Sequence, residues 1–467
     1  MSNARLKELA HRPVGRLLIQ YSTPAVIAML VMSMYNIVDR IFIGQGIDAK
    51  AIAGLAVTFP VMNLATALGV LVGAGASSRV SIHLGAGHRD LAVKTLSNAL
   101  IMTLVIGVVY IGLFAIFLDD ILMSFGASEN TLPYARDYMR WLLPGLLLTN
   151  LSFSFNNIQR ASGYPQRAMW TMVISAVMNI VLTPIFIFVF DMGIAGAALA
   201  TDIAMVGALL FVMVHFVNPH STLHFERGTF KVDWRIIWGI ITIGAAPSLV
   251  NAAGSLVNVL INTSLLEYGS DEAVGAAGIF STYTSLLVVV VLGVCQGMQP
   301  ILGYNYGARR FGRLKRAYNI SVIVGTIVCA VGATGSLLLP ELIARVFTND
   351  AHLIAVTAHG LRLSTMAFVV VGFQIVTSTF FQSIGLAPQS IVLALSRQVI
   401  FLIPLLVFLP PAYGLTGIWI CFPISDVLAT VVTALFIWHR MRIINRISAT
   451  VQPVDESADD KPQLTTV

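Results

Sequence analysis

The sequence predicts an all-α polytopic membrane protein, with twelve transmembrane helices arranged in two six-helix bundles. Three observations predict this fold class: the composition, the spacing of long apolar runs, and an internal repeat. Of the 467 residues, 57% are hydrophobic and only 11% are charged, and the mean hydropathy is +0.84. A soluble domain needs roughly 25% charged residues to cover its surface. Much of the surface of this chain must therefore face lipid.

The apolar runs are long enough to cross a membrane. A helix needs about 20 mostly apolar residues to span roughly 30 Å of hydrocarbon. We expect twelve spans, at residues 17–42, 51–78, 95–118, 134–159, 167–190, 194–217, 236–266, 273–300, 317–340, 358–384, 388–410 and 413–438. The connections between them are short, which excludes a large soluble domain.

Lysine and arginine residues gather on one side of this array. They cluster before the first span, in every second connection and after the last span. Because basic residues mark the cytoplasmic side, we expect a multi-pass protein of the bacterial inner membrane with both termini in the cytoplasm. The expected parts are an N-terminal segment 1–16, lobes 17–217 and 236–440, a cytoplasmic linker 218–235 and a disordered tail 441–467. The same placement argues against nucleic-acid binding, despite a net charge of +6.

The two halves of the chain repeat each other. A shift of 222 residues brings matching residues into register, among them Asn36 with Asn258, Gly75 with Gly297, and Gly163 with Gly385. One residue out of this register, Gly193 and Gly196 match Gly414 and Gly417, and Pro24 matches Pro247. Each half has six spans, so an axis along the membrane normal should relate them, as in known secondary transporters. A duplicated channel or a lipid-embedded enzyme is the alternative.

Four short motifs carry a resemblance to a known family: YNIVDRIFIG at 35–44, NIVLTPIFI at 179–187, GIAGAALAT at 193–201 and FPISD at 422–426. In this combination the chain resembles the multidrug and toxic compound extrusion (MATE) family, and more closely its DinF-like branch, up to the tail. The resemblance implies a V-shaped pair of bundles that exports cationic amphipathic drugs or toxins in exchange for protons or sodium ions. No enzymatic activity and no cofactor are expected, and we expect a monomer in the lipid bilayer.

Ionisable groups at membrane depth are costly and usually functional. Three acids qualify, namely Asp39, Asp202 and Asp426. Asp39 is the strongest candidate, because Tyr35 and Asn36 lie one turn earlier on the same helix face. Burial favours the neutral acid and hydrogen-bond donors favour the carboxylate, so this setting suits a reversible proton. The alternative is an interfacial carboxylate paired with the neighbouring Arg40.

The resemblance implies that the carboxylate at Asp39 titrates within a polar network of the N-terminal lobe. Asn179 and Thr201 match this network, together with Asn156 or the adjacent Asn157. We assign ion coupling to Asp39, Asn36, Asn179, Thr201 and Asp202, and the substrate cavity to Tyr35, Tyr138, Asn156, Asn157, Met172 and Met205. Flexible, polarisable methionines suit promiscuous binding, although ordinary packing explains them equally well.

One position departs from the family pattern. Thr183 stands where the fifth-span motif usually has aspartate, and a neutral hydroxyl cannot carry a second titrating charge. Either one acid suffices, or Asp202 substitutes from the neighbouring span, which we favour. The C-terminal half lacks the acids that the sodium-coupled NorM-like branch carries in spans 7 and 10, and a site for a hard cation usually includes a carboxylate. We therefore expect proton coupling, with sodium as the alternative and Asp426 as a secondary candidate site.

Pro24 lies in the middle of the first span, 15 residues before Asp39. Proline removes a backbone hydrogen bond and kinks a helix, so Pro24 is a candidate hinge. We expect protonation of Asp39 to break its polar contacts, bend the span at Pro24 and shrink the cavity so that the drug leaves. Pro247 occupies the matching position, so the alternative is a kink without function.

A flippase for a lipid-linked precursor is the rival function. Such a protein is expected to line its central cleft with several arginines and lysines that bind phosphate. Only Arg362 and Arg397 lie well inside the C-terminal spans. The sequence therefore favours drug export.

Overall fold

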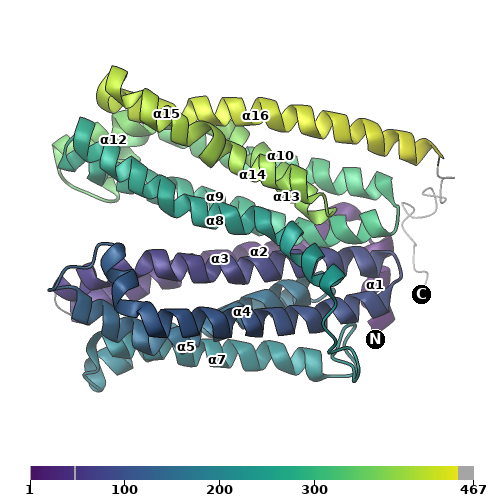
Figure 1. The fold of residues 1–467 in the computed structure, drawn as a ribbon. Coiled ribbons are helices and arrows are strands. Elements are labelled where there is room, and N and C mark those ends of the chain that lie inside the picture. The colour runs from purple at the N-terminus through teal and green to yellow at the C-terminus, as the bar shows by residue number, and fades with distance from the viewer. Residues whose placement is uncertain (1, 47–48, 451–467) are drawn as a thin grey trace, which may run out of the picture.

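The computed structural model describes residues 2–46 and 49–450, which form helices joined by short turns (Figure 1). A short helix precedes the N-terminal lobe, whose helices follow in chain order: α1 (Ser2–His11), α2 (Val14–Gly46), α3 (Ala49–Gly85), α4 (Arg89–Ser124), α5 (Leu132–Ala161), α6 (Pro165–Pro184), the π-helix η1 (Ile185–Val189) and α7 (Gly193–Val217). The C-terminal lobe holds α8 (Trp234–Tyr268), α9 (Asp271–Gly307), α10 (Phe311–Leu338), α11 (Pro340–Arg345), α12 (Ala351–Ser364), η2 (Phe368–Val370), α13 (Val371–Ser383), α14 (Ala387–Leu395), the π-helix η3 (Ser396–Leu402), α15 (Ile403–Phe408) and α16 (Pro410–Thr450).

The helices have the length and composition of membrane spans. Within the described residues, ten helices are long and apolar enough to cross a membrane, and the pair α12 and α13, bent by 57°, makes up to eleven. The expected span at 134–159 corresponds to α5, whose charged side chains, such as Arg136, Asp137 and Arg140, lower its hydropathy. This helix nevertheless packs against α3, α4 and α7. The predicted fold class is confirmed.

One expected boundary, the start of the disordered tail, is corrected by the structure. Helix α16 continues to Thr450, so the first part of the segment expected to be a disordered tail is helical. The reason is packing, because Ile444 is fully buried in the core of the C-terminal lobe. Residues 451–467 of the expected tail lie outside the described residues. At the other end, the expected N-terminal segment contains helix α1.

The internal repeat is visible in individual contacts. The Tyr110 hydroxyl donates to the carbonyl oxygen of Val61 at 2.7 Å, and the Tyr283 hydroxyl donates to the carbonyl oxygen of Gly332 at the same distance. Positions 61 and 110 become 283 and 332 after a shift of 222. The same contact is therefore made in both lobes, but the tyrosine lies on the second helix of the pair in the N-terminal lobe (α4) and on the first in the C-terminal lobe (α9).

Helices α3 and α9 cross where the pseudo-two-fold axis passes between the lobes. The Gln299 amide donates to the hydroxyls of Ser77 at 3.1 Å and Ser78 at 2.8 Å, and positions 77 and 299 are related by the repeat. Two glycines allow a close approach beside this crossing. A methyl group on Gly85 would lie 2.0 Å from the carbonyl oxygen of Tyr304, and one on Gly307 would lie 2.1 Å from that of Ile82.

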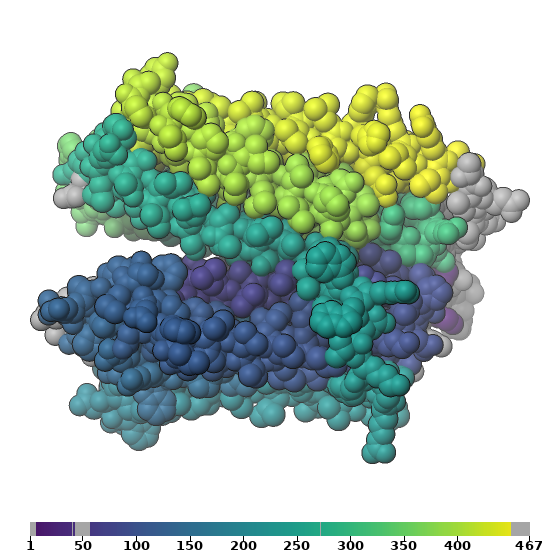
Figure 2. Space-filling view, in the orientation of Figure 1, coloured from purple at the N-terminus to yellow at the C-terminus, as the bar shows by residue number. Residues whose placement is uncertain are grey.

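The lobes are separated by a cleft at the end away from the two chain termini (Figure 2). At the end near the termini, α8 crosses toward the N-terminal lobe, and the small residues Gly75 and Gly244 bring α3 and α8 into backbone contact. The linker 218–235 lies at this closed end.

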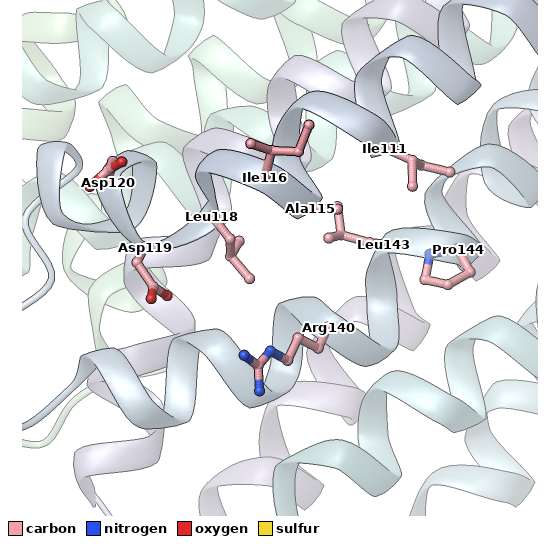
Figure 3. A pocket seen from close by; sticks show the side chains of 9 residues that line it. All are labelled: Ile111, Ala115, Ile116, Leu118, Asp119, Asp120, Arg140, Leu143 and Pro144. Atoms are coloured by element: carbon pink, nitrogen blue, oxygen red, sulfur yellow. The ribbon is translucent and has the colours of Figure 1, made fainter.

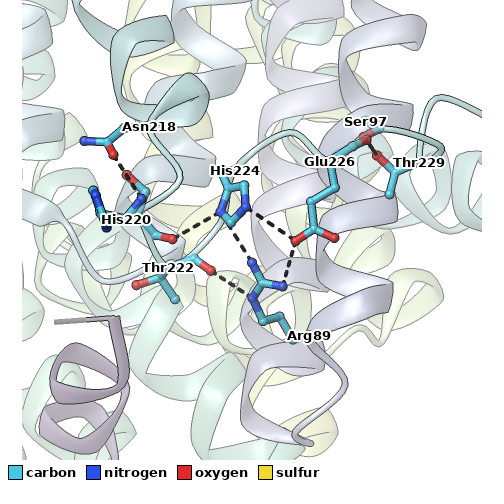
Figure 4. A network of polar contacts seen from close by, with 9 residues as sticks. Arg89, Ser97, Asn218, His220, Thr222, His224, Glu226 and Thr229 are labelled. Carbon is cyan, nitrogen blue, oxygen red and sulfur yellow. Dashed lines mark hydrogen bonds and ion pairs between the residues drawn. The ribbon is translucent and has the colours of Figure 1, made fainter.

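Polar contacts fasten the linker to α4 (Figure 4). Arg89 donates to the carboxylate of Glu226 at 2.7 Å and to the carbonyl oxygen of Thr222 at 3.3 Å. The hydroxyls of Ser97 and Thr229 lie 2.8 Å apart, within hydrogen-bonding distance. The linker is therefore bound to the surface of the N-terminal lobe.

Candidate functional site

A chain of polar side chains joins α2, α6 and α7 inside the N-terminal lobe. The Thr183 hydroxyl lies 3.2 Å from Oδ1 of Asp39 and 3.2 Å from Oδ1 of Asn179. The Asn179 amide in turn donates to the hydroxyl of Thr201 at 3.0 Å. Thr183 and Asn179 are almost fully buried, whereas Asp39 is half-buried. The structure thus brings together three of the predicted coupling residues, Asp39, Asn179 and Thr201.

The direction of the hydrogen bonds in this chain is fixed from its far end. The Thr201 hydroxyl donates to the carbonyl oxygen of Ala197 at 3.1 Å, so it must accept from the amide nitrogen of Asn179. The oxygen of Asn179 therefore faces Thr183. A threonine hydroxyl has one hydrogen to donate, so Thr183 can donate to Asn179 or to Asp39 but not to both.

This constraint makes the chain sensitive to a proton on Asp39. When Asp39 is protonated, its O–H can donate to Thr183, and Thr183 can donate to Asn179. When Asp39 is ionised, its carboxylate is the stronger of the two acceptors, so Thr183 turns to it and the described residues leave the oxygen of Asn179 without a donor. A buried acceptor without a donor costs about 1–3 kcal/mol. The charge on Asp39 of α2 is therefore linked to the hydrogen bond between Thr183 and Asn179 of α6.

Thr183 belongs to this chain, although the sequence alone does not assign it to the site. In the sequence it is only a departure from the family pattern, whereas in the structure its side chain links Asp39 to Asn179. The spacing offered a signal, because Asn179 and Thr183 are four residues apart and so lie on one face of a helix.

The other coupling candidates lie near this chain without a hydrogen bond to it. Asn36 is exposed, and its amide donates to the carbonyl oxygen of Met32 at 2.7 Å. The carboxylate of Asp202 packs against α5, where a methyl group on Gly145 would lie 1.6 Å from its Oδ1. This oxygen is buried and has no hydrogen-bond partner among the described residues. The side chain of Arg40, the alternative partner of Asp39, lies outside the described residues.

Tyr35 and Tyr138 lie within electrostatic range of Asp39, and Tyr138 also lies within range of Asp202. Tyr138 is buried and Tyr35 is half-buried. Both phenols therefore belong to the surroundings of the acids, Tyr35 on α2 and Tyr138 on α5.

Three of the predicted substrate residues line one cavity of about 60 Å³, deeper in the N-terminal lobe. Asn156, Met172 and Met205 form its wall, together with Met32 from α2 and other residues of α5 to α7. Asn157 is not part of it and turns toward α3, where its amide approaches Gly73. Pockets that bury a drug-sized ligand measure about 300–1,000 Å³, so this cavity is too small for such a ligand in the present conformation.

The cavity borders a contact between the lobes. Arg160, which follows directly after the expected span 134–159, is buried, with 4% of its surface exposed. Its guanidinium donates to Asn156 at 2.7 Å and makes a short hydrogen bond to Gln296 of α9. Helix α2 also contacts α9 here, because a methyl group on Gly297 would lie 2.4 Å from the Ser22 hydroxyl oxygen. Pro24 therefore lies where α2 is pressed against the opposite lobe.

A second hollow of about 540 Å³ lies between α4 and α5 and holds none of the predicted residues (Figure 3). It opens beside Phe117, where α4 is kinked, and Arg140, Asp119 and Asp120 form its polar wall. Asp119 is paired with Arg136 at 2.7 Å. The size of a cavity alone thus does not identify the site predicted from the sequence.

The secondary candidate, Asp426, lies in the C-terminal lobe. Its carboxylate accepts a hydrogen bond of 2.6 Å from Nε of Arg397, and only 1% of its surface is exposed. The structure therefore separates Asp426 from the polar chain around Asp39 and gives it a basic partner of its own.

Comparison with known proteins places this arrangement in a family. The family model described as MatE matches residues 24–185 and 247–408, so the second match repeats the first 223 residues later. The multidrug export protein MepA of Staphylococcus aureus is 26% identical over 441 residues, which cover 94% of this chain and 96% of the relative. A protein of Shewanella oneidensis named FAD transporter is 26% identical over 426 residues, which cover 90% and 93%.

A solved structure has the same fold. It is described as the outward-facing conformation of a multidrug resistance MATE family transporter of the MOP superfamily, and it is 27% identical to this chain. The TM-score is 0.87, and the match covers 97% of this chain and 98% of that one. Because the family model matches more than half of the sequence, once in each lobe, the chain belongs to the MATE family of multidrug efflux transporters.

Proposed function

We propose that this protein exports cationic amphipathic compounds across the bacterial inner membrane in exchange for protons, by alternating access, with both termini in the cytoplasm. One observation carries the proposal: the polar chain from Asp39 through Thr183 and Asn179 to Thr201. A single buried hydroxyl has to choose between two acceptors in this chain. The protonation of Asp39 decides the choice.

Helix α2 connects the proton to the substrate. It carries Asp39 at one end of the polar chain and Met32 in the wall of the cavity. Pro24 precedes both residues and lies where α2 contacts α9. A change in the hydrogen bond between Thr183 of α6 and Asp39 therefore moves Met32 in the cavity wall. Pro24 is the place where α2 can bend to allow this movement.

The hydrogen-bond geometry supports the same direction of coupling through a different change in contacts. A proton on Asp39 completes the chain of donors instead of breaking it, so the protonated state holds α2 against α6 and keeps the cavity small. After loss of the proton, Thr183 satisfies the carboxylate of Asp39 only at the expense of Asn179, and movement of α2 away from α6 returns the Thr183 hydroxyl to Asn179. The proton and the drug then favour opposite positions of α2, which is the requirement for exchange.

The observed conformation is consistent with release of the drug on the outer side of the membrane. The cleft opens at the end away from the termini, and the basic connections mark the terminal end as cytoplasmic. We infer that this state is outward-open, with the cavity already closed and the drug gone.

Two alternative functions would transport a different class of compound. A flippase would need several basic groups in the cleft, but Arg160 of the N-terminal lobe is bound to Asn156 and Gln296. An anionic cargo is favoured by one comparison, because the relative in Shewanella oneidensis is named FAD transporter. The drug-export proposal keeps the cationic compounds as the main class.

The experiment is dye efflux from everted membrane vesicles under an imposed proton gradient, with and without sodium. Wild type should transport a lipophilic cation without sodium, and Asp39→Asn should not. Asp119→Asn is the matched control, because it also removes a carboxylate from the N-terminal lobe but lies outside the polar chain. Full transport by Asp39→Asn would overturn the coupling site, and strict dependence on sodium would overturn the ion.

A further inference from the structure

The C-terminal lobe contains a polar cluster that the proposed exchange does not use. It consists of Gln374 on α13, Arg397 on η3 and Asp426 on α16. Arg397 donates through Nε to Oδ1 of Asp426 at 2.6 Å. The Gln374 amide makes a short hydrogen bond to the backbone carbonyl of Asp426 and donates to the Thr430 hydroxyl at 2.6 Å.

The cluster occupies the place that the substrate cavity has in the other lobe. Its counterparts by the internal repeat are Ser152 and Ser175, at a shift of 222, and Met205, at the shift of 221 that relates Gly193 to Gly414. The contacts correspond as well. Ser152 donates to the backbone carbonyl of Met205 at 3.4 Å, and Ser175 donates to its sulfur at 3.7 Å.

All three counterparts line the N-terminal cavity. The two lobes therefore place three side chains in the same arrangement but give them different chemistry. In the N-terminal lobe the three side chains are neutral and include a soft sulfur. In the C-terminal lobe they are an amide, a guanidinium and a carboxylate.

The guanidinium of Arg397 is held in a way that leaves it free to bind. Asp426 contacts it through Nε, and the described residues supply no hydrogen-bond partner to its two terminal nitrogens. The Asp426 side chain has 1% of its surface exposed, whereas that of Arg397 has 27%. A buried carboxylate thus fixes an arginine whose outer edge is accessible. Two parallel N–H groups on such an edge match a carboxylate or a phosphate.

Two oxygen atoms of the cluster also lack a partner. Oδ2 of Asp426 and Oε1 of Gln374 are buried and accept no hydrogen bond within the described residues. Buried polar atoms are nearly always satisfied in native structures. The ligand that satisfies the whole cluster therefore carries an anionic group for Arg397 together with N–H or O–H donors for these oxygens.

We propose that Gln374, Arg397 and Asp426 form a second ligand site in the C-terminal lobe, which binds the carboxylate or phosphate of an amphipathic compound. The site widens the range of ligands to zwitterions and anions, which the neutral N-terminal cavity does not attract. The inference rests on the proposed function only in that the ligand is a transported compound. Binding is therefore measured at equilibrium, without any gradient.

The test uses two dyes that differ in one charge: tetramethylrhodamine with a free carboxylate, and its methyl ester. Their affinities for the purified full-length protein in lipid nanodiscs are read from fluorescence polarisation. Arg397→Met should weaken binding of the free acid about tenfold or more, as expected for the loss of hydrogen bonds to a charged group. Binding of the ester should stay within about twofold. Equal losses for both dyes, or no selective loss for either the free acid or the phosphate probe described below, would overturn the proposal.

Two further variants control for a non-specific effect of removing an arginine and for loss of folding. Arg362→Met removes the other arginine of the C-terminal spans and should leave both affinities unchanged. Arg397→Met alone leaves Asp426 buried without a partner, which is destabilising, whereas replacing both members of a buried ion pair by apolar groups is often tolerated. The double variant Arg397→Met with Asp426→Leu should therefore fold and show the same selective loss of the free acid.

A second pair of probes separates the two anionic groups. Riboflavin and flavin mononucleotide differ by one phosphate, and quenching of flavin fluorescence reports their binding. Selective loss of flavin mononucleotide in the Arg397 variants assigns the site to phosphates, and selective loss of only the rhodamine acid assigns it to carboxylates. Asp39→Asn should keep the discrimination in both pairs, so a failure of proton coupling and a failure of this site are distinguishable.

Discussion

Replacing Thr183 by aspartate tests the polar chain directly, because it places a second carboxylate beside Asp39. The Thr183 hydroxyl lies 3.2 Å from Oδ1 of Asp39, so the two negative charges would be about 4 Å apart. At an effective dielectric constant of about 20, this separation costs about 4 kcal/mol. Since 1.36 kcal/mol corresponds to about one pH unit, the pair should keep one shared proton up to a pH about three units above the wild-type titration.

The assay is an infrared titration of the protonated carboxyl band in purified protein, in sodium-free buffer. The band that disappears in Asp39→Asn identifies the group in wild type. Thr183→Asn is the matched control, because it has the shape of aspartate without its charge, and its titration should stay close to that of wild type. A Thr183→Asp protein that titrates like wild type would show that position 183 does not adjoin Asp39, and the proposed coupling would lose its basis.

The remaining predictions concern α2 and the glycine contacts. Pro24→Ala should still bind a lipophilic cation at equilibrium but lose vesicle transport, and undiminished transport would remove the hinge from the mechanism. Gly145→Ala should lower thermal stability by about 1–3 kcal/mol through overpacking, because its methyl group would lie 1.6 Å from Asp202. A double-mutant cycle with Asp202→Ala should recover most of that loss, and simple additivity would refute the contact. Gly85→Ala and Gly307→Ala should each destabilise the closed end of the cleft, and by similar amounts, as judged by melting temperature; a large loss in only one would contradict the symmetric crossing.

The architecture was predictable because it rests on quantities that a sequence carries in bulk. Apolar runs of sufficient length, basic connections and matched glycines at a constant shift were enough for twelve spans in two bundles. The glycines were informative for a physical reason. Gly163 and Gly385, and likewise Gly193 and Gly414, adopt positive φ in both lobes, a conformation that other residues avoid.

The site was predictable only in part. Asp39 was predicted because acids are rare at membrane depth, and the family resemblance added Asn179 and Thr201; the structure joins all three in one chain of hydrogen bonds. Thr183 was not assigned, because one more hydroxyl in an apolar helix looks like any other until its two acceptors are seen. The burial of Arg160 and its contact with Gln296 of the other lobe were not predicted, because a basic residue next to the end of a span is expected in a solvated connection. The assignments to the DinF-like branch, to the substrate cavity and to the hinge stay predictions.

The crossing of α3 and α9 has a mechanical consequence. From Gly85 back to the start of α3 at Ala49, a helix that rises 1.5 Å per residue extends about 50 Å. The close contacts at Gly85 and Gly307 therefore act as a pivot about which the long helices can tilt. A tilt of only about 10° at this pivot displaces the far end of such a helix by about 9 Å, given that length. The two lobes can thus open a passage wide enough for a drug while the close-packed glycines hardly shift, so large movement and a stable core coexist in one molecule.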